Sequence, residues 1–171
     1  MKKLSLILFS SLIFLLSPTL SISAEKVISG KAEVVDADTI KINKIKIRLF
    51  GIDAPEKEQV CKKIYMSFFI FNFEKNYKCG EESALALLKK LKKKKIKCFI
   101  EKNKDRYKRS IGVCYLKNED INKWLVKNGY AIAYKKYSKK YVLDEKYAKE
   151  NKLGIWRGSF TEPEKWRRIM N

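Results

Sequence analysis

Apolar and polar residues alternate over two short stretches in the first third of the chain, and this period of two predicts β-strands. The stretches are Thr39–Ile42 and Ile45–Leu49, and they follow a longer apolar-rich strand predicted over residues 27–35. Further along, residues 96–101 and 111–116 have the composition of two paired strands. The pattern therefore predicts five strands, of which the first three form a meander.

Helical periodicity predicts helices over residues 81–95, 120–127 and about 143–152. In the first of these, leucines form an apolar stripe opposite a lysine-rich face, and acidic residues precede the lysines, as the helix dipole favours. One helix between the third and fourth strands, with helices after the fifth, is the order of an OB-fold. We therefore predict an α+β fold, a five-stranded OB-fold β-barrel with about three helices.

Two segments do not fit this periodic pattern. Residues 64–73 are rich in phenylalanine and show no clean period. Aromatic-rich stretches usually belong to a core, so we favour additional core under a loop, with a surface that contacts lipid or a partner as the alternative. From Arg157 onwards the chain is basic, and we expect residues 159–171 to form a loosely held tail.

The N-terminal residues have the pattern of an export signal. A basic start is followed by the apolar run Leu4–Leu16, by Pro18, and by small residues that suit cleavage near Ala24. The run is short for a membrane span, so we predict a cleaved signal peptide at residues 1–24 rather than an uncleaved anchor. The mature domain, residues 25–158, is then secreted or periplasmic, with no stable membrane span after processing.

Charge and the absence of histidine narrow the function. Removal of Lys2 and Lys3 with the signal lowers the formal charge from +20 by two, to +18. Such a charge favours polyanionic partners, although lysine runs also simply solvate a surface. The chain contains no histidine, which excludes a Ser-His-Asp triad, a histidine general base and histidine metal ligands.

Four cysteines follow the signal segment, an even number that suggests two disulfides in an exported chain. Sequence alone allows three pairings. Cys98 and Cys114 lie on the two arms of a predicted hairpin, which favours Cys98–Cys114 and leaves Cys61–Cys79 to close the intervening loop. A zinc site of four cysteines is the alternative, but the chain has no CxxC pair.

The residues with candidate chemistry gather in residues 34–56, VVDADTIKINKIKIRLFGIDAPE. Carboxylates are hard oxygen donors and a guanidinium is a permanent planar cation, so together they suggest a metal and a phosphate bound side by side. A second short block, DRYKR, occupies residues 105–109. The candidate side chains in the first block are Asp36, Asp38, Arg48, Asp53 and Glu56.

The first block strongly resembles the active-site segment of the staphylococcal-nuclease-like (thermonuclease) family, and DRYKR resembles that family's other phosphate-contacting segment. The resemblance covers about residues 30–156. It implies an OB-fold and a Ca²⁺-dependent nuclease that acts on DNA and RNA and leaves 3′-phosphate ends. Exported members carry cysteines at similar places, which supports the same two disulfides.

We predict that Asp38 and Asp53 bind one Ca²⁺ per site, with Mn²⁺ or Mg²⁺ also admitted by a carboxylate site. The resemblance adds the backbone carbonyl of Ala54 as a ligand, and Asp36 is expected to orient water at the metal from just outside the ligand set. Glu56 is the expected general base, or alternatively a group that orients the attacking water.

Arg48 and Arg109 are the expected phosphate clamps, because a guanidinium matches phosphate geometry with two hydrogen bonds. Lys108 stands where the family usually has glycine. If that position needs a positive φ, lysine costs strain on the order of 1 kcal/mol. Arg106 is a candidate for contact with the nucleic-acid backbone, and Asp105 for stabilising the turn.

Tyrosines are the expected base-stacking residues. Tyr107 lies inside DRYKR, and Tyr134 and Tyr137 follow Gly129, where the family places two tyrosines that contact the nucleotide. Here two residues intervene between them where the family usually has one, and core packing is the alternative for either.

The sequence thus predicts an exported, monomeric, calcium-dependent endonuclease with little sequence preference. A binding module of the same fold without catalysis, or a cationic protein that binds the cell envelope, are the alternatives.

Overall fold

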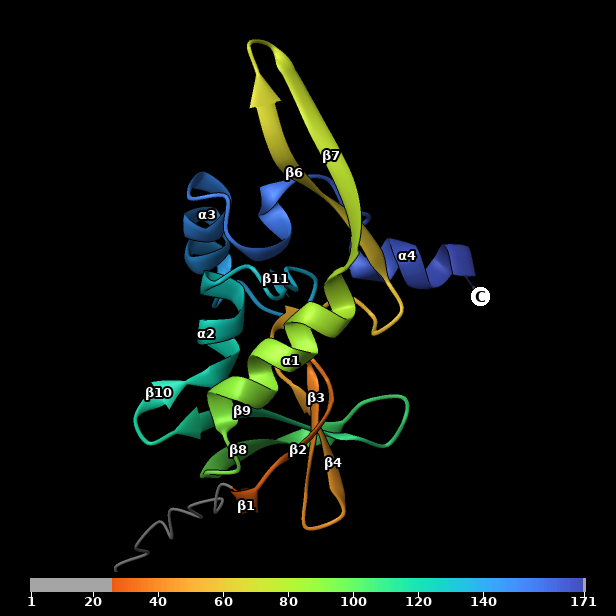
Figure 1. The fold of residues 1–171 in the computed structure, drawn as a ribbon. Helices are drawn as coiled ribbons and strands as arrows, with labels where there is room; N and C mark the ends of the chain where they lie inside the picture. The colour runs from red at the N-terminus through yellow and green to blue at the C-terminus, as the bar shows by residue number, and fades with distance from the viewer. Residues whose placement is uncertain (1–25, 171) are drawn as a thin grey trace, which may run out of the picture.

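The computed structural model describes residues 26–170, which form a curled β-sheet covered by helices, with a long hairpin projecting from it (Figure 1). The strands of the sheet lie in the order β1-β8-β9-β4-β3-β2, and β10 pairs with β9. The predicted α+β, OB-type architecture is confirmed. The strands of this sheet are β1 (Lys26–Lys31), β2 (Glu33–Asp36), β3 (Thr39–Ile42), β4 (Ile45–Leu49), β8 (Lys95–Lys104), β9 (Ser110–Leu116) and β10 (Glu119–Asp120).

The predicted strand over residues 27–35 is divided into β1 and β2, with Ala32 between them. The division lets one segment contribute to both ends of the sheet, since β1 pairs with β8 and β2 pairs with β3. The sheet therefore curls over a single apolar interior rather than remaining flat. The side chains of β4 alternate between the two faces of this sheet: Ile47 and Leu49 are buried in the interior, and Arg48 lies on the opposite face.

Both predicted disulfides are confirmed. Cys98 of β8 lies directly opposite Cys114 of β9, and the bridge between them is fully buried. The second bridge joins Cys61 to Cys79, at the foot of the projecting hairpin. One disulfide thus fixes the barrel, and the other ties the hairpin to the helix that follows it.

Three of the helices are those predicted from periodicity. They are α1 (Cys79–Leu91), α2 (Ile121–Lys127) and α3 (Val142–Glu150). Helix α1 is shorter than predicted because Lys92 adopts a left-handed conformation that ends it. Asp120 caps α2 by accepting a hydrogen bond from the backbone N–H of Lys123, which is the ordinary role of a short acidic side chain there.

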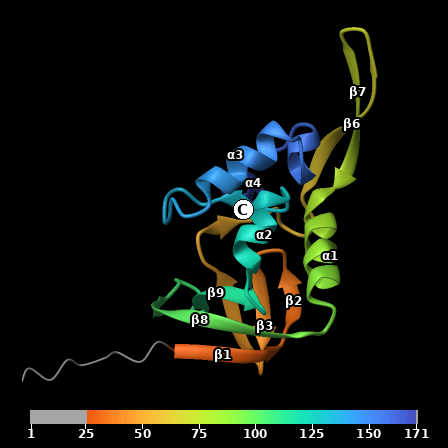
Figure 2. The same cartoon turned by 90° about the vertical axis from the view of Figure 1, so that its left-hand side faces the viewer.

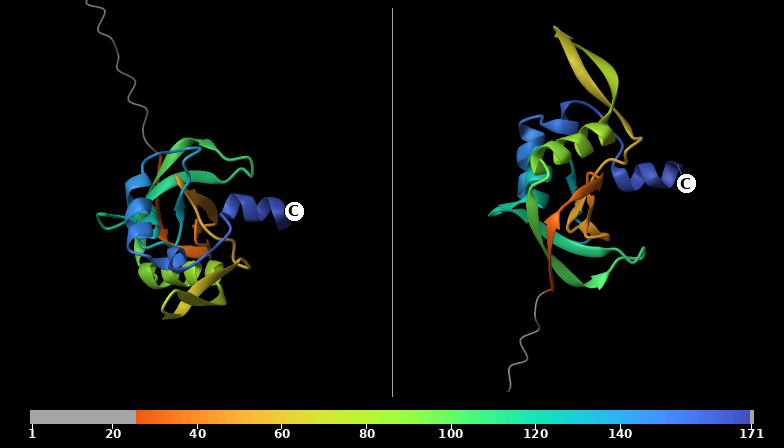
Figure 3. Two further views of the ribbon diagram at one scale, coloured as in Figure 1. Left: turned by 90° about the horizontal axis from the view of Figure 1, so that it is seen from above. Right: turned by 60° about the horizontal axis from the view of Figure 1, so that its bottom comes forward.

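The expectation of a loosely held C-terminal tail is wrong. After a short 3₁₀ helix, η1 (Gly154–Arg157), the chain forms helix α4 (Pro163–Met170) beside the sheet (Figure 3). Buried Gln59 holds the segment before α4 by donating a hydrogen bond from Nε2 to the carbonyl of Thr161, at 2.7 Å. The basic composition did not indicate helix α4, and the segment before it is held by a contact with a residue distant in sequence.

The interpretation of residues 64–73 as additional core is also wrong. They form the outer part of a two-stranded hairpin, β6 (Val60–Phe68) and β7 (Phe71–Lys78), which projects away from the sheet and helices (Figure 2). The side chain of Phe69, at the turn, is 90% exposed. The sequence lacked a period here because neither face of the ribbon packs on the domain.

A two-stranded sheet of β5 (Ile52–Asp53) and β11 (Ile132–Ala133) connects the barrel to the helical half of the domain. The predicted signal peptide, residues 1–24, lies outside the described residues. Within residues 26–170, no helix has the length and apolar character needed to cross a bilayer.

Candidate active site

Two buried aspartates and one arginine form the centre of the candidate site. Asp38 and Asp53 are 4% and 0% exposed, and burial of a carboxylate is costly unless it has a charged partner. Arg48 supplies it: Nη1 lies 2.5 Å from Asp38 Oδ2 and Nη2 lies 2.6 Å from Asp53 Oδ1. Asp38 also accepts a hydrogen bond from the backbone N–H of Ala54 at 3.1 Å.

Strand geometry explains why these three side chains meet. Asp38 occupies the turn between β2 and β3, where its carbonyl accepts the N–H of Leu49. Arg48 pairs in register with Thr39, the residue after Asp38. Because side chains alternate across a strand, the apolar positions that face the core direct Arg48 towards the carboxylates. The hydrophobic pattern thereby fixes the site.

Arg109 reaches the same site from the β8–β9 connection. Its Nε donates to Asp105 Oδ2 at 2.6 Å, and its Nη1 donates to Thr39 Oγ1 at 3.2 Å. Asp105 also accepts the backbone N–H groups of Tyr107 and Arg109, and these bonds to Arg109 outweigh partial burial and lower the pKa of Asp105. The predicted turn-stabilising role of Asp105 agrees with these bonds. Lys108 adopts φ 60, the left-handed conformation that glycine accommodates best.

Glu56 lies in the loop after β5, which close packing holds in place. Gln59 Oε1 accepts the backbone N–H of Glu56, and the carbonyl of Glu56 accepts the N–H of Gln59. Gly80, in the first turn of α1, lies against this loop so closely that a Cβ there would be 1.7 Å from the Glu56 carbonyl oxygen. The absence of a side chain at Gly80 therefore permits the observed position of Glu56.

Arg167 of α4 completes the cluster, and the sequence interpretation missed it. Its Nη1 donates to Glu56 Oε1 at 2.7 Å, and its Nη2 lies 2.9 Å from Asp53 Oδ2. One signal was available: only six of the 39 basic residues are arginines, and three of those six reach this site. Sequence position alone gave no reason to bring residue 167 to residue 53.

Asp36 differs from the other carboxylates of the site. Among residues 26–170 it forms no ion pair, and its buried Oδ1 has no hydrogen-bond partner there. Burial, followed by the nearby charges of Asp38 and Glu56, raises the pKa of Asp36 to about 6. Burial would lower the pKa of Arg48, but the Asp38 and Asp53 carboxylates outweigh it and raise that pKa. The site therefore keeps one unsatisfied negative group beside two saturated ones.

These residues fit a divalent cation chemically. All the candidate ligands are oxygens, as Ca²⁺ requires, and the orphaned oxygen of Asp36 is the kind of atom that a nearby cation satisfies. Across residues 26–170, however, no three acidic side chains converge into a ready coordination sphere. Arg48 and Arg167 lie between the carboxylates instead, so the cation must compete with guanidinium groups for them.

The tyrosines surround the cluster at different depths. Tyr134 is half-buried, and burial followed by the Glu164 carboxylate raises its pKa to about 12. Its ring lies edge-on to Tyr137, with centroids 4.8 Å apart, and Tyr137 is 65% exposed. Tyr107 is also exposed, and its ring packs under the guanidinium groups of Arg106 and Arg109. Tyr107 and Tyr137 therefore have exposed aromatic surface, whereas Tyr134 is partly covered.

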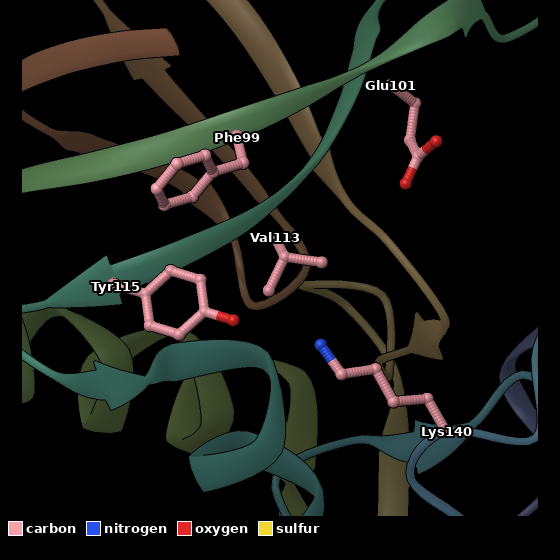
Figure 4. A pocket seen from close by; sticks show the side chains of 5 residues that line it. All are labelled: Phe99, Glu101, Val113, Tyr115 and Lys140. Atoms are coloured by element: carbon pink, nitrogen blue, oxygen red, sulfur yellow. The ribbon is translucent and has the colours of Figure 1, made fainter. Parts of the chain in front are cut away.

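A shallow hollow lies on the outer side of β8 and β9 (Figure 4), lined by Phe99, Glu101, Val113, Tyr115 and Lys140. It shares no residue with the carboxylate–arginine cluster. Its lysine is also paired with Asp120 at 3.1 Å. The groups with reactive chemistry accordingly lie outside this hollow.

Comparison with known proteins gives a consistent result. The sequence model described as "Staphylococcal nuclease homologue" matches residues 46–158. An uncharacterized endonuclease of Haemophilus influenzae is 33% identical over 95% of this chain and 85% of its own. The succinoglycan biosynthesis protein ExoI of Rhizobium meliloti is 36% identical over 79% of this chain and 67% of its own. The probable staphylococcal-like nuclease CAN2 of Oryza sativa is 31% identical, over 77% of this chain but 31% of its own.

Proposed function

Since the chain belongs to the staphylococcal nuclease family, we propose that it is a calcium-dependent endonuclease that hydrolyses DNA and RNA with little sequence preference. One observation carries the proposal. Two buried carboxylates, two arginines and a loop glutamate converge from four separate segments, and each has a role that phosphodiester hydrolysis requires. The residues are Asp38, Arg48, Asp53, Glu56 and Arg109.

Arg48 and Arg109 are proposed to bind the scissile phosphate. A phosphodiester is anionic and repels nucleophiles, so its charge must be neutralised before attack. Both guanidinium groups are held by carboxylates, Arg48 by Asp38 and Asp53 and Arg109 by Asp105. Such fixed donors need little reorganisation as charge builds on the phosphate oxygens in the transition state.

Glu56 is proposed as the general base. It takes a proton from water as the oxygen of that water bonds to phosphorus and the bond from phosphorus to the 5′-oxygen breaks, which leaves a 3′-phosphate end. A well-placed carboxylate contributes about 10²–10⁴-fold to such a step. Arg167 pairs with Oε1 of Glu56, so the other carboxylate oxygen is the one proposed to accept the proton.

Asp38, Asp53 and the carbonyl of Ala54 are proposed to hold Ca²⁺, with Asp36 orienting water beside it. When bound, the cation supplies Lewis-acid stabilisation of the phosphate charge. Mn²⁺ and Mg²⁺ are chemically acceptable alternatives. Buried carboxylates at Asp38 and Asp53, with the unsatisfied oxygen of Asp36, support this assignment.

Stacking on exposed rings supports the lack of sequence preference. Tyr107, Tyr134 and Tyr137 are proposed to stack on bases and Arg106 to contact the backbone, which any sequence tolerates. The two disulfides, within the residues described, fit an oxidising compartment. We propose a secreted or periplasmic protein that acts as a monomer.

Purified residues 25–171 should be tested on single-stranded DNA, double-stranded DNA and RNA of matched sequence, with Ca²⁺, Mg²⁺ or EGTA. Glu56→Gln tests the base, and Glu58→Gln is the matched control because Glu58 is an exposed carboxylate in the same loop. We expect cleavage that EGTA abolishes, that Glu56→Gln lowers at least about 10²-fold, and that Glu58→Gln leaves unchanged.

Binding of nucleic acid without cleavage under every metal would contradict the enzyme and favour a binding module of the same fold. Equal rates for the parent and Glu56→Gln would remove the general base from the mechanism while leaving the nuclease in place. The RNA arm separately decides the substrate range.

A further inference from the structure

The outer half of the β6–β7 hairpin is uncharged and exposed to solvent. Residues 64–73 contain no charged side chain, in a chain of which 34% is charged. The four residues at the end of the hairpin, which we call the tip, are large, apolar and exposed. They are Phe68 at 62%, Phe69 at 90%, Ile70 at 86% and Phe71 at 63%. A contiguous exposed apolar patch of this kind marks an interaction surface.

The tip is apolar on every side. Successive strand residues point to opposite faces, so a ribbon made to dock on a protein would have one apolar and one polar face. Here Tyr65 and Met66, which are neighbours in β6, are both more than half exposed. The two polar side chains near the tip bond to each other, since Ser67 Oγ donates to Asn72 Oδ1 at 2.8 Å. Such a ribbon suits a medium that is apolar all around it.

Backbone conformation points the same way. Phe69 adopts φ 50 at the hairpin turn, where glycine or asparagine is favoured and a bulky residue is unfavourable. The ring of Phe69 lies edge-on to that of Phe68, at 4.6 Å between centroids. An unfavourable residue at an exposed turn is best explained by what its side chain contacts outside the chain.

Lysines follow the aromatic tip at a fixed distance. Lys63 lies directly opposite Lys75 in the hairpin register, a pairing of like charges that is unfavourable unless anions lie nearby. Each of them is six positions from Phe69 at the turn, which is about 20 Å of strand. Tyr65 lies between these lysines and the tip, within 5.9 Å of the Lys75 ammonium. The order along the ribbon is therefore apolar residues, then Tyr65, then a charged level where Glu74, opposite Ile64, adjoins the lysine pair.

That order matches one face of a lipid bilayer. Apolar side chains enter about 5–10 Å below the headgroups, tyrosine prefers the headgroup level, and lysines contact anionic headgroups from the water side. A wedge in duplex DNA fits less well. The phosphates border a minor groove only about 6 Å wide, whereas the lysines lie about 20 Å behind the tip.

We propose that the tip of the β6–β7 hairpin inserts into the interface of a bilayer with anionic headgroups and holds the domain at that surface. The hairpin projects away from the barrel and from α4 (Figures 1 and 2). The barrel strands and α4, which carry the candidate active site, therefore lie away from the inserted tip. This proposal does not depend on the nuclease activity.

The test is flotation of residues 25–171 with vesicles of phosphatidylglycerol and phosphatidylcholine, beside vesicles of phosphatidylcholine alone. The variant Phe69→Ser with Ile70→Ser removes the apolar tip. Leu143→Ser is the matched control, because Leu143 is 79% exposed on α3. We expect the parent and the control to float only with the anionic vesicles, and the tip variant to bind them at least about 10-fold more weakly.

Phe69→Trp then reports insertion directly. We expect its fluorescence, after subtraction of the signal from the native tryptophans, to shift to shorter wavelength with anionic vesicles and to be quenched by brominated acyl chains. Far-ultraviolet circular dichroism confirms that each variant is folded. Because vesicle binding is measured without substrate, failure here is distinguishable from failure of the nuclease proposal.

Three outcomes would overturn the proposal. Equal flotation of the parent and the tip variant would mean that lysine electrostatics alone, and not insertion of the tip, causes the vesicle binding. No flotation of the parent would exclude lipid, and a parent dimer that the tip variant converts to a monomer would then assign the tip to a second copy of the chain. A tip substitution that weakens duplex DNA binding by the Glu56→Gln protein, without affecting flotation, would assign the tip to DNA.

Discussion

The carboxylate–arginine cluster and the β6–β7 hairpin depart from normal burial in opposite directions. The cluster places charge inside: Asp38 and Asp53 are buried, and Arg48 connects them. The hairpin places phenylalanine outside, with Phe69 almost fully exposed. Neither arrangement favours folding by itself. Both regions are therefore best explained by what they bind.

The two regions differ in what holds them. The cluster is built from the strands of the barrel, whose register is fixed by a buried interior and by the Cys98–Cys114 bridge. The hairpin is anchored at its base, where Cys61 joins Cys79 and Lys62 donates its N–H to the carbonyl of Ser159. Changes in the cluster should affect stability and activity together, whereas changes at the tip should affect neither.

Arg48→Ala is expected to have the largest effect on both stability and cleavage. It leaves two buried carboxylates without their shared cation, which costs about 3–5 kcal/mol of unfolding free energy, and it removes a phosphate clamp. We expect cleavage to fall at least about 10³-fold. Urea unfolding in EGTA and single-turnover cleavage measure the two effects.

The tip variant Phe69→Ser with Ile70→Ser is the contrast to Arg48→Ala. Its unfolding free energy should stay within about 0.5 kcal/mol of the parent, as for other exposed positions, and its cleavage of a short oligonucleotide in solution should be unchanged. A large loss of stability in this variant would mean that the tip packs on the domain, and the comparison would fail.

Arg167→Ala tests whether Arg167 competes with a cation for the carboxylates of the cluster. Because Arg167 pairs with Asp53 and Glu56, its removal frees carboxylates that a cation would otherwise have to compete for. We expect Ca²⁺ to bind several-fold more tightly, a change of about 1 kcal/mol, measured by isothermal titration calorimetry. Arg168→Ala, an exposed neighbour, should leave the affinity unchanged. Weaker Ca²⁺ binding to Arg167→Ala would instead make Arg167 a support for the site.

Lys108→Gly is the smallest expected effect. Lys108 has φ 60 in the β8–β9 connection, and glycine relieves that strain at the cost of a more flexible unfolded chain. We expect a gain of up to about 1 kcal/mol in urea unfolding. Lys102→Gly, within the exposed part of β8, should be destabilising. A loss of stability in both would mean that the turn does not strain Lys108.

Much of the barrel and of the site was predictable because it depends on local pattern. Alternation in β3 and β4 fixes which side chains face the core, and the same alternation directs Arg48 to the opposite side. Asp38 and Asp53 flank those strands in sequence, so their proximity follows from the meander. The family resemblance then extended this reading to Arg109 and to the tyrosines.

The two wrong expectations have a common cause. Residues 64–73 carry no periodic signal that separates a covered surface from an open one. In the C-terminal segment, Trp166, Ile169 and Met170 have helical spacing, but this spacing does not show what the helix lies against. Phenylalanine is usually buried and chain ends are usually loose, but these are averages over many proteins. The outer half of the hairpin is exposed among the residues that the structure describes, whereas the C-terminal segment is bonded to Gln59.

The sequence by itself determined the fold class and favoured the observed disulfide pairs, because short-range alternation and the places of the cysteines carry that information. Its resemblance to a known family completed the set of candidate site residues. Only the tertiary structure decided that Arg167 reaches Asp53 and Glu56 from α4, and that the aromatic hairpin stands free of the core. Both outcomes depend on contacts between segments that are distant in the chain, or on the lack of them, and no local pattern encodes either.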